Sequence, residues 1–275
     1  MSQGRGTTDW SAVERIIAEA EAGGGSVGVT LVGPNGDTFA HNADRKYGAA
    51  STVKIPLMVE IFRQIDRGER SLDDPYTLVD EDRAAGSGVI LELHTGITLT
   101  LNDLVYLMMA ISDNTATNIL IDYAGMDNVT ATMRELGMTQ SLLGRKMKGR
   151  PAEEGEQENW ATPGDYARLM QALLANQVAS ADSCAKMVAM LEKQQNTRRI
   201  SRYLPESDKI RWGSKTGSVR GVTNDVGFVT TDAGTLIVSI YCEGLADQHV
   251  GEKVIGDITR AALEATGVAE PLHTS

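Results

Sequence analysis

Three short polar motifs in this sequence carry residue types that could act together on a carbonyl group. The first is Ser51-Thr52-Val53-Lys54, where an apolar segment begins. Residues three apart share a helix face, so the hydroxyl of Ser51 and the amine of Lys54 would be neighbours. Burial and nearby positive charge could lower the pKa of Lys54 and let it accept the serine proton. Taken alone, such a pair is more often a serine N-cap followed by a surface lysine.

The second motif is Ser112-Asp113-Asn114, between two helical patterns. The hydroxyl of Ser112 could pass a proton to a leaving group, and the amide of Asn114 could hold a substrate carbonyl. By itself, the motif also fits an ordinary break between helices in which Ser or Asp caps the second helix.

The third motif is Lys215-Thr216-Gly217-Ser218, at the end of an expected strand. Lys215 could bind a substrate carboxylate, with hydrogen bonds from the hydroxyls of Thr216 and Ser218. Gly217 would let a ligand lie close against the strand. By itself, this motif is a strand that runs into a turn.

Hydrophobic periodicity indicates the elements that must position these motifs. Strand patterns occur near both ends of the chain and helical patterns occupy its middle. Helices are expected over 9–22, 51–67, 101–111, 115–123, 127–136, 181–193 and 247–266, with a further helix starting at 162, and strands over 27–31, 38–40, 225–230 and 235–241.

This order of elements predicts an α/β (α+β) fold in a single domain. An antiparallel sheet flanked by the terminal helices would form one lobe from residues 1–46 and 194–275. An all-helical lobe from residues 47–193 would be inserted into it. A cleft between two such lobes is a common place for an active site.

The composition of the chain restricts the classes of partner that it can bind. The net charge of −11, from 26 basic and 37 acidic residues, argues against nucleic acid or an anionic membrane as a partner. No apolar run is long enough to span a bilayer, and residues 1–6 lack the apolar run of a secretory signal. We therefore expect a monomer that is cytoplasmic as written, or exported if a signal has been removed.

The two cysteines, Cys184 and Cys242, lie far apart and lack partners at metal-ligand spacing. They could be two buried thiols or one disulfide, and free thiols are favoured. We expect neither a metal nor a cofactor.

In this order the three motifs resemble the S-x-x-K, S-D-N and K-T-G signatures of the class A β-lactamases and the class A β-lactamase-related serine hydrolases. The resemblance covers nearly the whole chain and implies the β-lactamase/transpeptidase-like fold. The flanking segments are also similar to the family: Tyr47-Gly48-Ala49-Ala50, Asn118-Ile119-Leu120 and Thr223-Asn224-Asp225.

The resemblance implies a role for each residue of the first two motifs. Ser51 would attack the carbonyl of a β-lactam or a related amide or ester and become acylated. Lys54 would accept or relay its proton, and Ser112 would pass a proton to the leaving nitrogen. Asn114 would hold the substrate side chain.

The resemblance also implies a role for each residue of the third motif. Lys215, Thr216 and Ser218 would bind the substrate carboxylate, and Gly217 would line the site. The backbone N–H groups of Ser51 and Ser218 would form the oxyanion hole. Arg220 is either an extra carboxylate clamp or a solvated turn arginine.

Two departures from the family concern the loop before Pro163 and the mouth of the cleft. The family's E-x-x-L-N sequence is absent from residues 144–163, and its catalytic position falls near Lys146 or Met147. A nearby glutamate could serve instead, or these residues form a solvated acidic face: Glu153, Glu154, Glu156 and Glu158. Arg145 and Asn159 could clasp the loop ends. At the mouth, Gly86-Ser87-Gly88 replaces the usual aromatic residue and predicts a wider entrance.

Three functions follow from this pattern, all on a small-molecule substrate. The first is a β-lactamase that opens the ring through an acyl-serine intermediate. The second is an esterase, amidase or D-Ala-D-Ala-type peptidase of the same fold that deacylates β-lactams weakly. The third is a penicillin-binding module that stays acylated.

Overall fold

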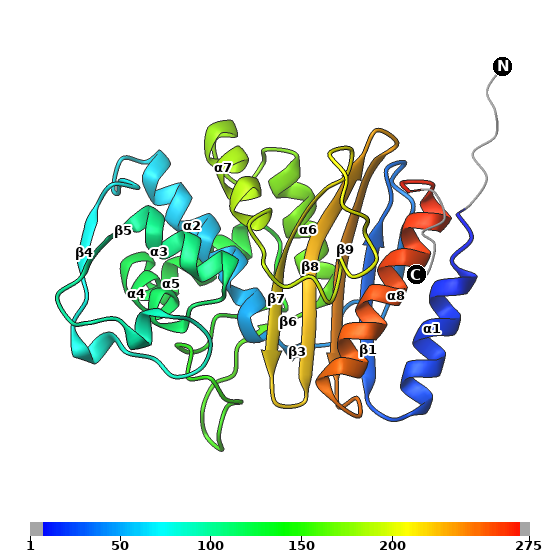
Figure 1. Cartoon of the computed structure of the whole chain (residues 1–275), viewed down its shortest axis with the longest axis horizontal. Coiled ribbons are helices and arrows are strands. Elements are labelled where there is room, and N and C mark those ends of the chain that lie inside the picture. Colours follow the sequence, from blue (N-terminus) through cyan, green and yellow to red (C-terminus); the bar gives the residue numbers. More distant parts are fainter. Residues whose placement is uncertain (1–7, 270–275) are drawn as a thin grey trace.

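A five-stranded antiparallel sheet separates two groups of helices in a computed structural model that describes residues 8–269 (Figure 1). The strand order is β2-β1-β9-β8-β7. The bounds of the strands are β1 Ser26–Val32, β2 Thr38–His41, β7 Arg211–Val219, β8 Val222–Thr231 and β9 Gly234–Glu243. Strands from both ends of the described chain therefore share one sheet, because β1 pairs with β9 along its whole length.

Helices α1 (Ser11–Ala22) and α8 (Gln248–Thr266) lie side by side on one face of the sheet, next to the described chain ends (Figure 1). Their apolar side chains pack against alternate residues of the central strands. Val27, Val29 and Leu31 of β1 belong to this core, as do apolar residues of β9. The period-2 alternation of β1 explains why these three residues share a face.

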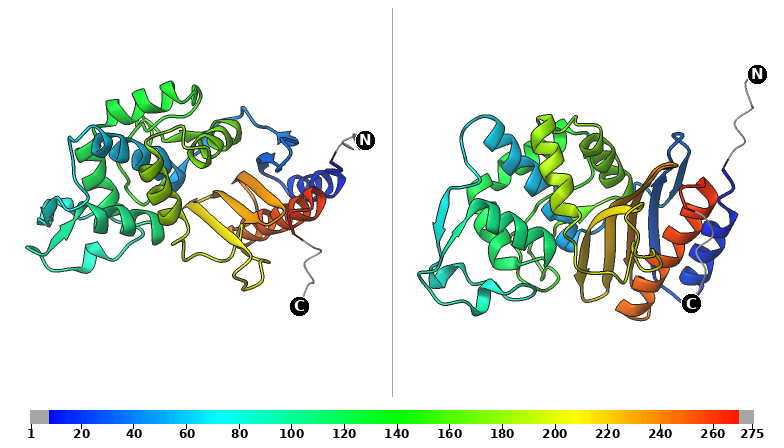
Figure 2. Two further views of the ribbon diagram at one scale, coloured as in Figure 1. Left: turned by 90° about the horizontal axis from the view of Figure 1, so that it is seen from above. Right: turned by 45° about the horizontal axis from the view of Figure 1, so that its top comes forward.

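The opposite face of the sheet packs against the other helices, which gather at one side of the molecule (Figure 2). Helix α2 runs through the middle of this group, and ten of its 13 residues are buried. Apolar residues on several sides of α2 suit this interior position, and Lys54, Glu60 and Gln64 are buried with them. The bounds of these helices are α2 Lys54–Asp66, α3 Leu101–Ala110, α4 Asn114–Ala124, α5 Met126–Glu135, α6 Pro163–Leu174 and α7 Ala181–Leu191.

The predicted fold class is confirmed: an antiparallel sheet, terminal helices on one face, and a helical group formed by the middle of the chain. Some short elements were not expected from the sequence. They are β3 Tyr47–Gly48, β4 Pro75–Thr77, β5 Thr98–Thr100, β6 Trp160–Ala161 and the 3₁₀ helices η1 Ala50–Val53, η2 Asp80–Asp82 and η3 Ile90–Glu92. Elements this short carry too little periodicity to be recognised.

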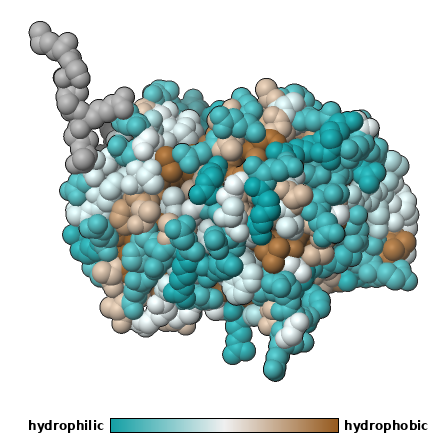
Figure 3. Space-filling view, turned by 180° about the vertical axis from the view of Figure 1, so that it is seen from behind, coloured by the Kyte–Doolittle hydropathy of each residue, from teal (hydrophilic) through white to brown (hydrophobic). Residues whose placement is uncertain are grey.

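Other expectations concern the surface and the cysteines. In residues 8–269, no helix is long and apolar enough to cross a membrane. Hydrophilic side chains cover most of the rear face, with hydrophobic ones only in small patches (Figure 3). Cys184 and Cys242 are buried free thiols, as predicted. Residues 1–6, in which we expect no secretory signal, lie outside the described residues. So do residue 7 and residues 270–275 of the expected sheet lobe.

Candidate active site

The three motifs meet at Ser51, beside which two cavities open. The loop cavity, of about 370 Å³, is bounded by Asn114 and by the loop between α5 and β6. The amide cavity, of about 470 Å³, is bounded by Ser112, Thr216 and residues 194–199. The residues that line both are Ser51, Ser87 and Ser218. The two cavities therefore form one cleft with Ser51 at its centre.

Lys54 is completely buried beneath this cleft. Its Nζ lies 2.8 Å from the carbonyl oxygen of Ser112, 3.0 Å from the Ser112 Oγ and 3.0 Å from the Oδ1 of Asn114. Burial, aided by the positive charge of Lys215, holds the pKa of Lys54 well below its usual range. A neutral amine has two hydrogens and one lone pair. The carbonyl of Ser112 and the Oδ1 of Asn114 can take the hydrogens, which leaves the lone pair for the hydroxyl of Ser112.

The base is therefore tied to Ser112 more directly than to Ser51. The backbone N–H of Lys54 donates to the carbonyl oxygen of Ser51 where η1 runs into α2. Within residues 8–269, no hydrogen bond joins the side chains of these two residues, whereas the amine of Lys54 contacts Ser112 directly. Ser51 sits on a 3₁₀ turn and not inside the α-helix that the sequence predicts. The hydroxyl of Ser112 lies at hydrogen-bonding distance from the amine and can relay a proton to or from it.

Two residues at this site have backbone conformations that side chains disfavour. Ala50, next to Ser51, has φ +45°, and Ser112 has φ +62°. Each such conformation costs about 1–3 kcal/mol and persists only where the surrounding structure fixes it. The strain therefore falls beside Ser51 and at Ser112.

Asn114 keeps one amide hydrogen for a ligand. Its Oδ1 accepts from Lys54, and its Nδ2 donates one hydrogen to the carbonyl oxygen of Ala85 at 2.9 Å. An amide has two N–H donors, so the second is available in the loop cavity that Asn114 lines. This geometry suits a substrate carbonyl.

Asp113, the middle residue of the second motif, anchors the mouth of the cleft. Its carboxylate accepts the backbone N–H of Ala116 as the N-cap of α4, and those of Val89 and Ile90 at 2.7 and 2.9 Å. A Cβ on Gly88, whose φ is +123°, would lie 2.3 Å from that carboxylate. The mouth segment that replaces the family's aromatic residue is thus held by Asp113, and only glycine fits beside it.

Strand β7 lies directly against η1, and Gly217 is the reason that it can. A Cβ at Gly217 would lie 2.9 Å from the carbonyl oxygen of Ala49 and 3.2 Å from the backbone nitrogen of Ser51. The space beside Gly217 is filled by the chain itself, whereas the sequence suggested that a ligand would use it. This approach brings the backbone of Ser218 next to that of Ser51.

The third motif is divided between the two faces of β7, because alternate residues of a strand point to opposite sides. Thr216 and Ser218 line the cleft, whereas Lys215 and Gly217 line neither cavity. Lys215 is fully buried and its Nζ donates to the carbonyl oxygen of Thr216 at 2.9 Å. Burial lowers the pKa of Lys215 to about 7, with Asp225 opposing this shift and Arg199 adding to it.

Arg199 is the site residue that sequence reasoning missed. It is 1% exposed and donates to the carbonyl oxygens of Gly217 and Asn224, at 3.0 and 2.6 Å, and to the Oγ of Ser218. Glu252 of α8 balances its charge at 3.5 Å. A guanidinium only donates, so the Oγ of Ser218 accepts and its own hydrogen is free for a ligand.

Arg220, the arginine that the sequence suggested, lies elsewhere. It is exposed in the turn between β7 and β8 and lines the loop cavity, not the amide cavity. Adjacent arginines within the polar run 194–199 were the available signal for Arg199. Its burial depends on packing against α8, which the sequence pattern does not reveal.

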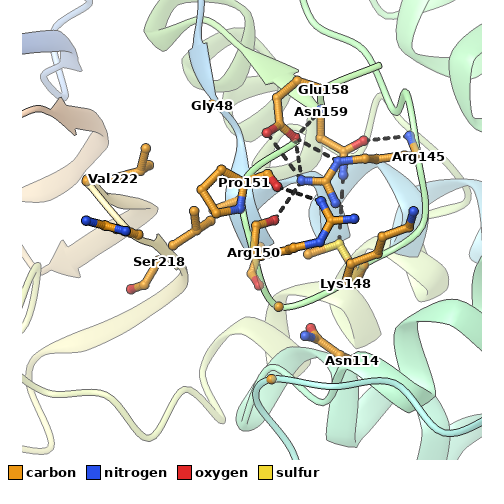
Figure 4. Close-up of a pocket in the computed structure, with 18 of the residues that line it drawn as sticks. Gly48, Asn114, Arg145, Lys148, Arg150, Pro151, Glu158, Asn159, Ser218 and Val222 are labelled. Atoms are coloured by element: carbon orange, nitrogen blue, oxygen red, sulfur yellow. Dashed lines mark hydrogen bonds and ion pairs between the residues drawn. The ribbon is translucent and has the colours of Figure 1, made fainter. Parts of the chain in front are cut away.

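The ends of the loop between α5 and β6 are fastened by an ion pair (Figure 4). Arg145 lies 3.0 Å from Glu158, and both side chains are mostly buried. The Oδ1 of Asn159 accepts the backbone N–H groups of Gly144 and Arg145 at 2.8 and 2.9 Å. The expected clasp between the side chains of Arg145 and Asn159 is therefore wrong: Glu158 takes the arginine and Asn159 binds backbone.

Met147 is one of the two residues near which the family's loop glutamate is expected. Its backbone N–H and C=O bond to the side chain of Asn118 at 2.8 and 3.0 Å, and it lines the loop cavity with Ser51. Lys146, the other candidate, instead pairs with Asp122 at the surface. The amide Nδ2 of Asn159 lies 3.9 Å from the Met147 sulfur.

Of the four nearby glutamates, Glu153 and Glu154 are exposed, whereas Glu156 and Glu158 are engaged with other partners. Glu158 lines the loop cavity, but its two oxygens accept from Arg145 and from the backbone of Asn159 and Ala152. Glu156 pairs with Lys148 and Arg150. These contacts, and not a solvated acidic face, account for both carboxylates.

Known proteins and solved structures are similar to this chain over nearly its whole length. The model of the beta-lactamase enzyme family matches residues 10–266. Beta-lactamase VEB-1 of Pseudomonas aeruginosa is 26% identical over 264 residues, covering 90% of this chain and 87% of that protein. The solved structure of a beta-lactamase from Sphaerobacter thermophilus DSM 20745 is 61% identical, with a TM-score of 0.94 over 96% of this chain and 100% of that chain. The structure of an ancestral class A beta-lactamase is 26% identical, with a TM-score of 0.85 over 93% and 100% of the two chains.

Proposed function

Because this chain belongs to the beta-lactamase enzyme family, we propose that it is a serine hydrolase that opens β-lactam rings through a covalent bond to Ser51. The observation that carries the proposal is the buried Lys54. Its contacts with Ser112 and Asn114 hold the amine beneath the cleft that Ser51 lines, and its lowered pKa favours the neutral form. A base in this state can accept a serine proton.

Acylation follows from this arrangement. The Oγ of Ser51 forms a bond to the carbonyl carbon, and its proton passes to Lys54. The backbone N–H groups of Ser51 and Ser218 stabilise the oxyanion. The C–N bond then breaks, and the nitrogen takes a proton from the hydroxyl of Ser112, which Lys54 replenishes at 3.0 Å.

The substrate is held on both sides of the scissile bond. The free N–H of Asn114 binds the carbonyl of the acyl side chain in the loop cavity. The hydroxyls of Thr216 and Ser218 donate to the carboxylate, while Lys215 and Arg199 supply positive charge from within the protein. Arg199 takes the supporting role that the sequence suggested for Arg220.

Deacylation is the slow step in this proposal. A water that attacks the acyl-serine needs a base, and the position of the family's loop carboxylate falls near Lys146 or Met147, neither of which is an acid. Of these two residues, Met147 lines the loop cavity with Ser51. General-base catalysis typically contributes about 10²–10⁴-fold, and its loss would leave a long-lived acyl-enzyme. This observation favours a second candidate function. The chain would turn over another ester, amide or D-Ala-D-Ala-type peptide, or act as a penicillin-binding module, and hydrolyse β-lactams slowly.

The deciding experiment is stopped-flow absorbance with a chromogenic cephalosporin, followed by intact mass spectrometry. A burst of one equivalent, an adduct on Ser51 and slow steady turnover are expected. The Ser51→Ala variant should give neither burst nor adduct. An adduct that persisted in this variant would refute the assignment of the nucleophile, and rapid turnover with no burst would refute slow deacylation.

A further inference from the structure

The loop cavity and the amide cavity are lined by residues that act on different sides of the scissile bond. Ser112, which gives its proton to the departing group, lines the amide cavity and not the loop cavity. Asn114, which holds the acyl side, lines only the loop cavity. A substrate bound across Ser51 therefore places its leaving group in the amide cavity.

One wall of the amide cavity is a continuous polar run, Gln194-Gln195-Asn196-Thr197-Arg198-Arg199. Its backbone is fixed at several points. The side chain of Gln194 donates to the carbonyl oxygen of Ser214 on β7 at 3.3 Å and accepts the backbone N–H of Asn196 at 3.0 Å. The backbone N–H of Gln195 donates to the carbonyl oxygen of Ala110 at the end of α3. These contacts fix the run to β7 of the sheet on one side and to the end of α3 on the other.

Side chains on this wall remain available for a ligand. Within residues 8–269, the amide of Gln195 and the hydroxyl of Thr197 make no hydrogen bond. Arg198 is 59% exposed and shares Glu252 at 3.5 Å. No carboxylate side chain is among the described residues that line this cavity. The wall therefore offers hydrogen-bond donors and positive charge, together with the carbonyl oxygens of amides.

The size of the cavity adds a second constraint. Its volume of about 470 Å³ is within the range of cavities that bury drug-sized ligands. A carboxylate on Thr216 and Ser218 fills only the part next to β7. The remaining space faces Gln195, Thr197 and Gln248. The amide of Gln248 already donates to Glu252 at 3.0 Å, whereas a leaving group without further polar atoms would cover Gln195 and Thr197 and leave them unpaired.

We propose that the amide cavity is a specificity subsite for leaving groups that carry, besides the carboxylate, a second polar group of carboxamide or carboxylate type. This inference rests on the proposed function, since it requires acylation of Ser51. Gln195 and Thr197 are its specificity-determining residues. A cationic or a branched apolar substituent at the same position is disfavoured.

A series of thioesters with one N-acyl-D-alanyl group tests this directly. The leaving thiols are 2-mercaptopropanoate, its analogue with a carboxamide on the methyl group, and its analogue with an isobutyl group in place of the methyl. In each case the Ser51 Oγ–acyl bond forms, the C–S bond breaks, and the serine proton reaches the departing sulfur through Lys54 and Ser112. The kcat/KM is measured from thiol release, and the adduct from intact mass.

The carboxamide thioester should react about tenfold faster than the isobutyl one, the effect of one to two hydrogen bonds. Gln195→Ala and Thr197→Val should each reduce this ratio by about threefold, and the double variant should bring it close to one. Gln177→Ala is the matched control, because Gln177 is an exposed glutamine that lines neither cavity, and it should keep the wild-type ratio.

Equal rates for the carboxamide and isobutyl thioesters, with the propanoate thioester still acylating Ser51, would overturn the subsite and leave the proposed function intact. A ratio unchanged in the double variant would overturn the assignment to Gln195 and Thr197. If the propanoate thioester and the cephalosporin both fail to acylate Ser51, the proposed function fails and the subsite falls with it.

Discussion

The guanidinium of Arg199 donates to the hydroxyl of Ser218, so a residue with almost no exposed surface controls a hydroxyl that faces the cleft. In the proposed function, Ser218 donates its own hydrogen to the substrate carboxylate. Ser218→Ala should lower kcat/KM for a carboxylate-bearing β-lactam by about tenfold. Acylation of the corresponding methyl ester should change less than threefold. The measurement is the rate of acyl-enzyme formation with both substrates.

Arg220 provides the contrast for this prediction. It is exposed and lines the loop cavity but not the amide cavity, so Arg220→Ala should preserve the preference for the carboxylate over the ester. If Arg220→Ala abolished the preference and Ser218→Ala did not, the two residues would have been assigned the wrong way round.

The charge of Lys215 should make the preference for a carboxylate substrate over its methyl ester depend on pH. Its pKa of about 7 means that it is charged below pH 7 and neutral above it. A neutral Lys215 attracts a carboxylate less, so the ratio of kcat/KM for the carboxylate substrate to that for its methyl ester should fall about tenfold between pH 6 and pH 9. Titration of Lys54 affects both substrates and cancels in the ratio. A flat ratio in the wild type would contradict this role.

The Lys215→Met variant is the control for that profile. It carries no charge at any pH, so its ratio should be low and independent of pH. Because Lys215 also helps to lower the pKa of Lys54, the variant should retain a larger fraction of protonated Lys54 and acylate more slowly at low pH with both substrates.

Met147 offers a test of the missing base. Met147→Glu places a carboxylate in the loop cavity on a backbone that Asn118 already fixes. Deacylation should accelerate by about 10²–10⁴-fold, and the burst should become sustained turnover. Met147→Gln is the matched control and should keep the wild-type rate. Equal deacylation rates in the two variants would show that the position does not reach the acyl-serine.

The ion pair between Arg145 and Glu158 should stabilise the loop that forms the loop cavity. Their side chains are 11% and 19% exposed, and removal of the acid leaves a nearly buried guanidinium without its counter-charge. Glu158→Ala should lower the free energy of unfolding by about 2 kcal/mol, measured by urea denaturation. Glu154→Ala, an exposed change on the same loop, should have no effect.

The order of helices and strands was predictable because their apolar residues repeat with clear periods, as in α2 and β1. The sequence motifs also located Ser51, Lys54, Ser112 and Asn114, which the structure brings into one cleft. Alternation along β7 could have separated Thr216 and Ser218 from Lys215, since neighbours on a strand face opposite ways.

The contacts of the loop and of Arg199 were beyond sequence reasoning for a physical reason. Arg199 is buried by packing against Glu252 of α8, and Glu158 is matched to Arg145 across a loop without regular structure. Neither pairing follows from local propensity, because each depends on how distant segments dock. For this reason the sequence predicts a contact between Arg145 and Asn159, where the structure has an ion pair between Arg145 and Glu158.

The pairing of β1 with β9 determines when the cleft can form as the chain is synthesised. Ser26 of β1 lies opposite Glu243 of β9. The first strand to be synthesised therefore cannot pair with β9 until the last strand of the sheet has been synthesised. Pairings between such distant segments fold slowly. Ser51 emerges early, yet β7, which borders it, comes after the whole helical group. A nascent chain therefore carries an unreactive serine, and labelling of Ser51 reports that folding has reached its end.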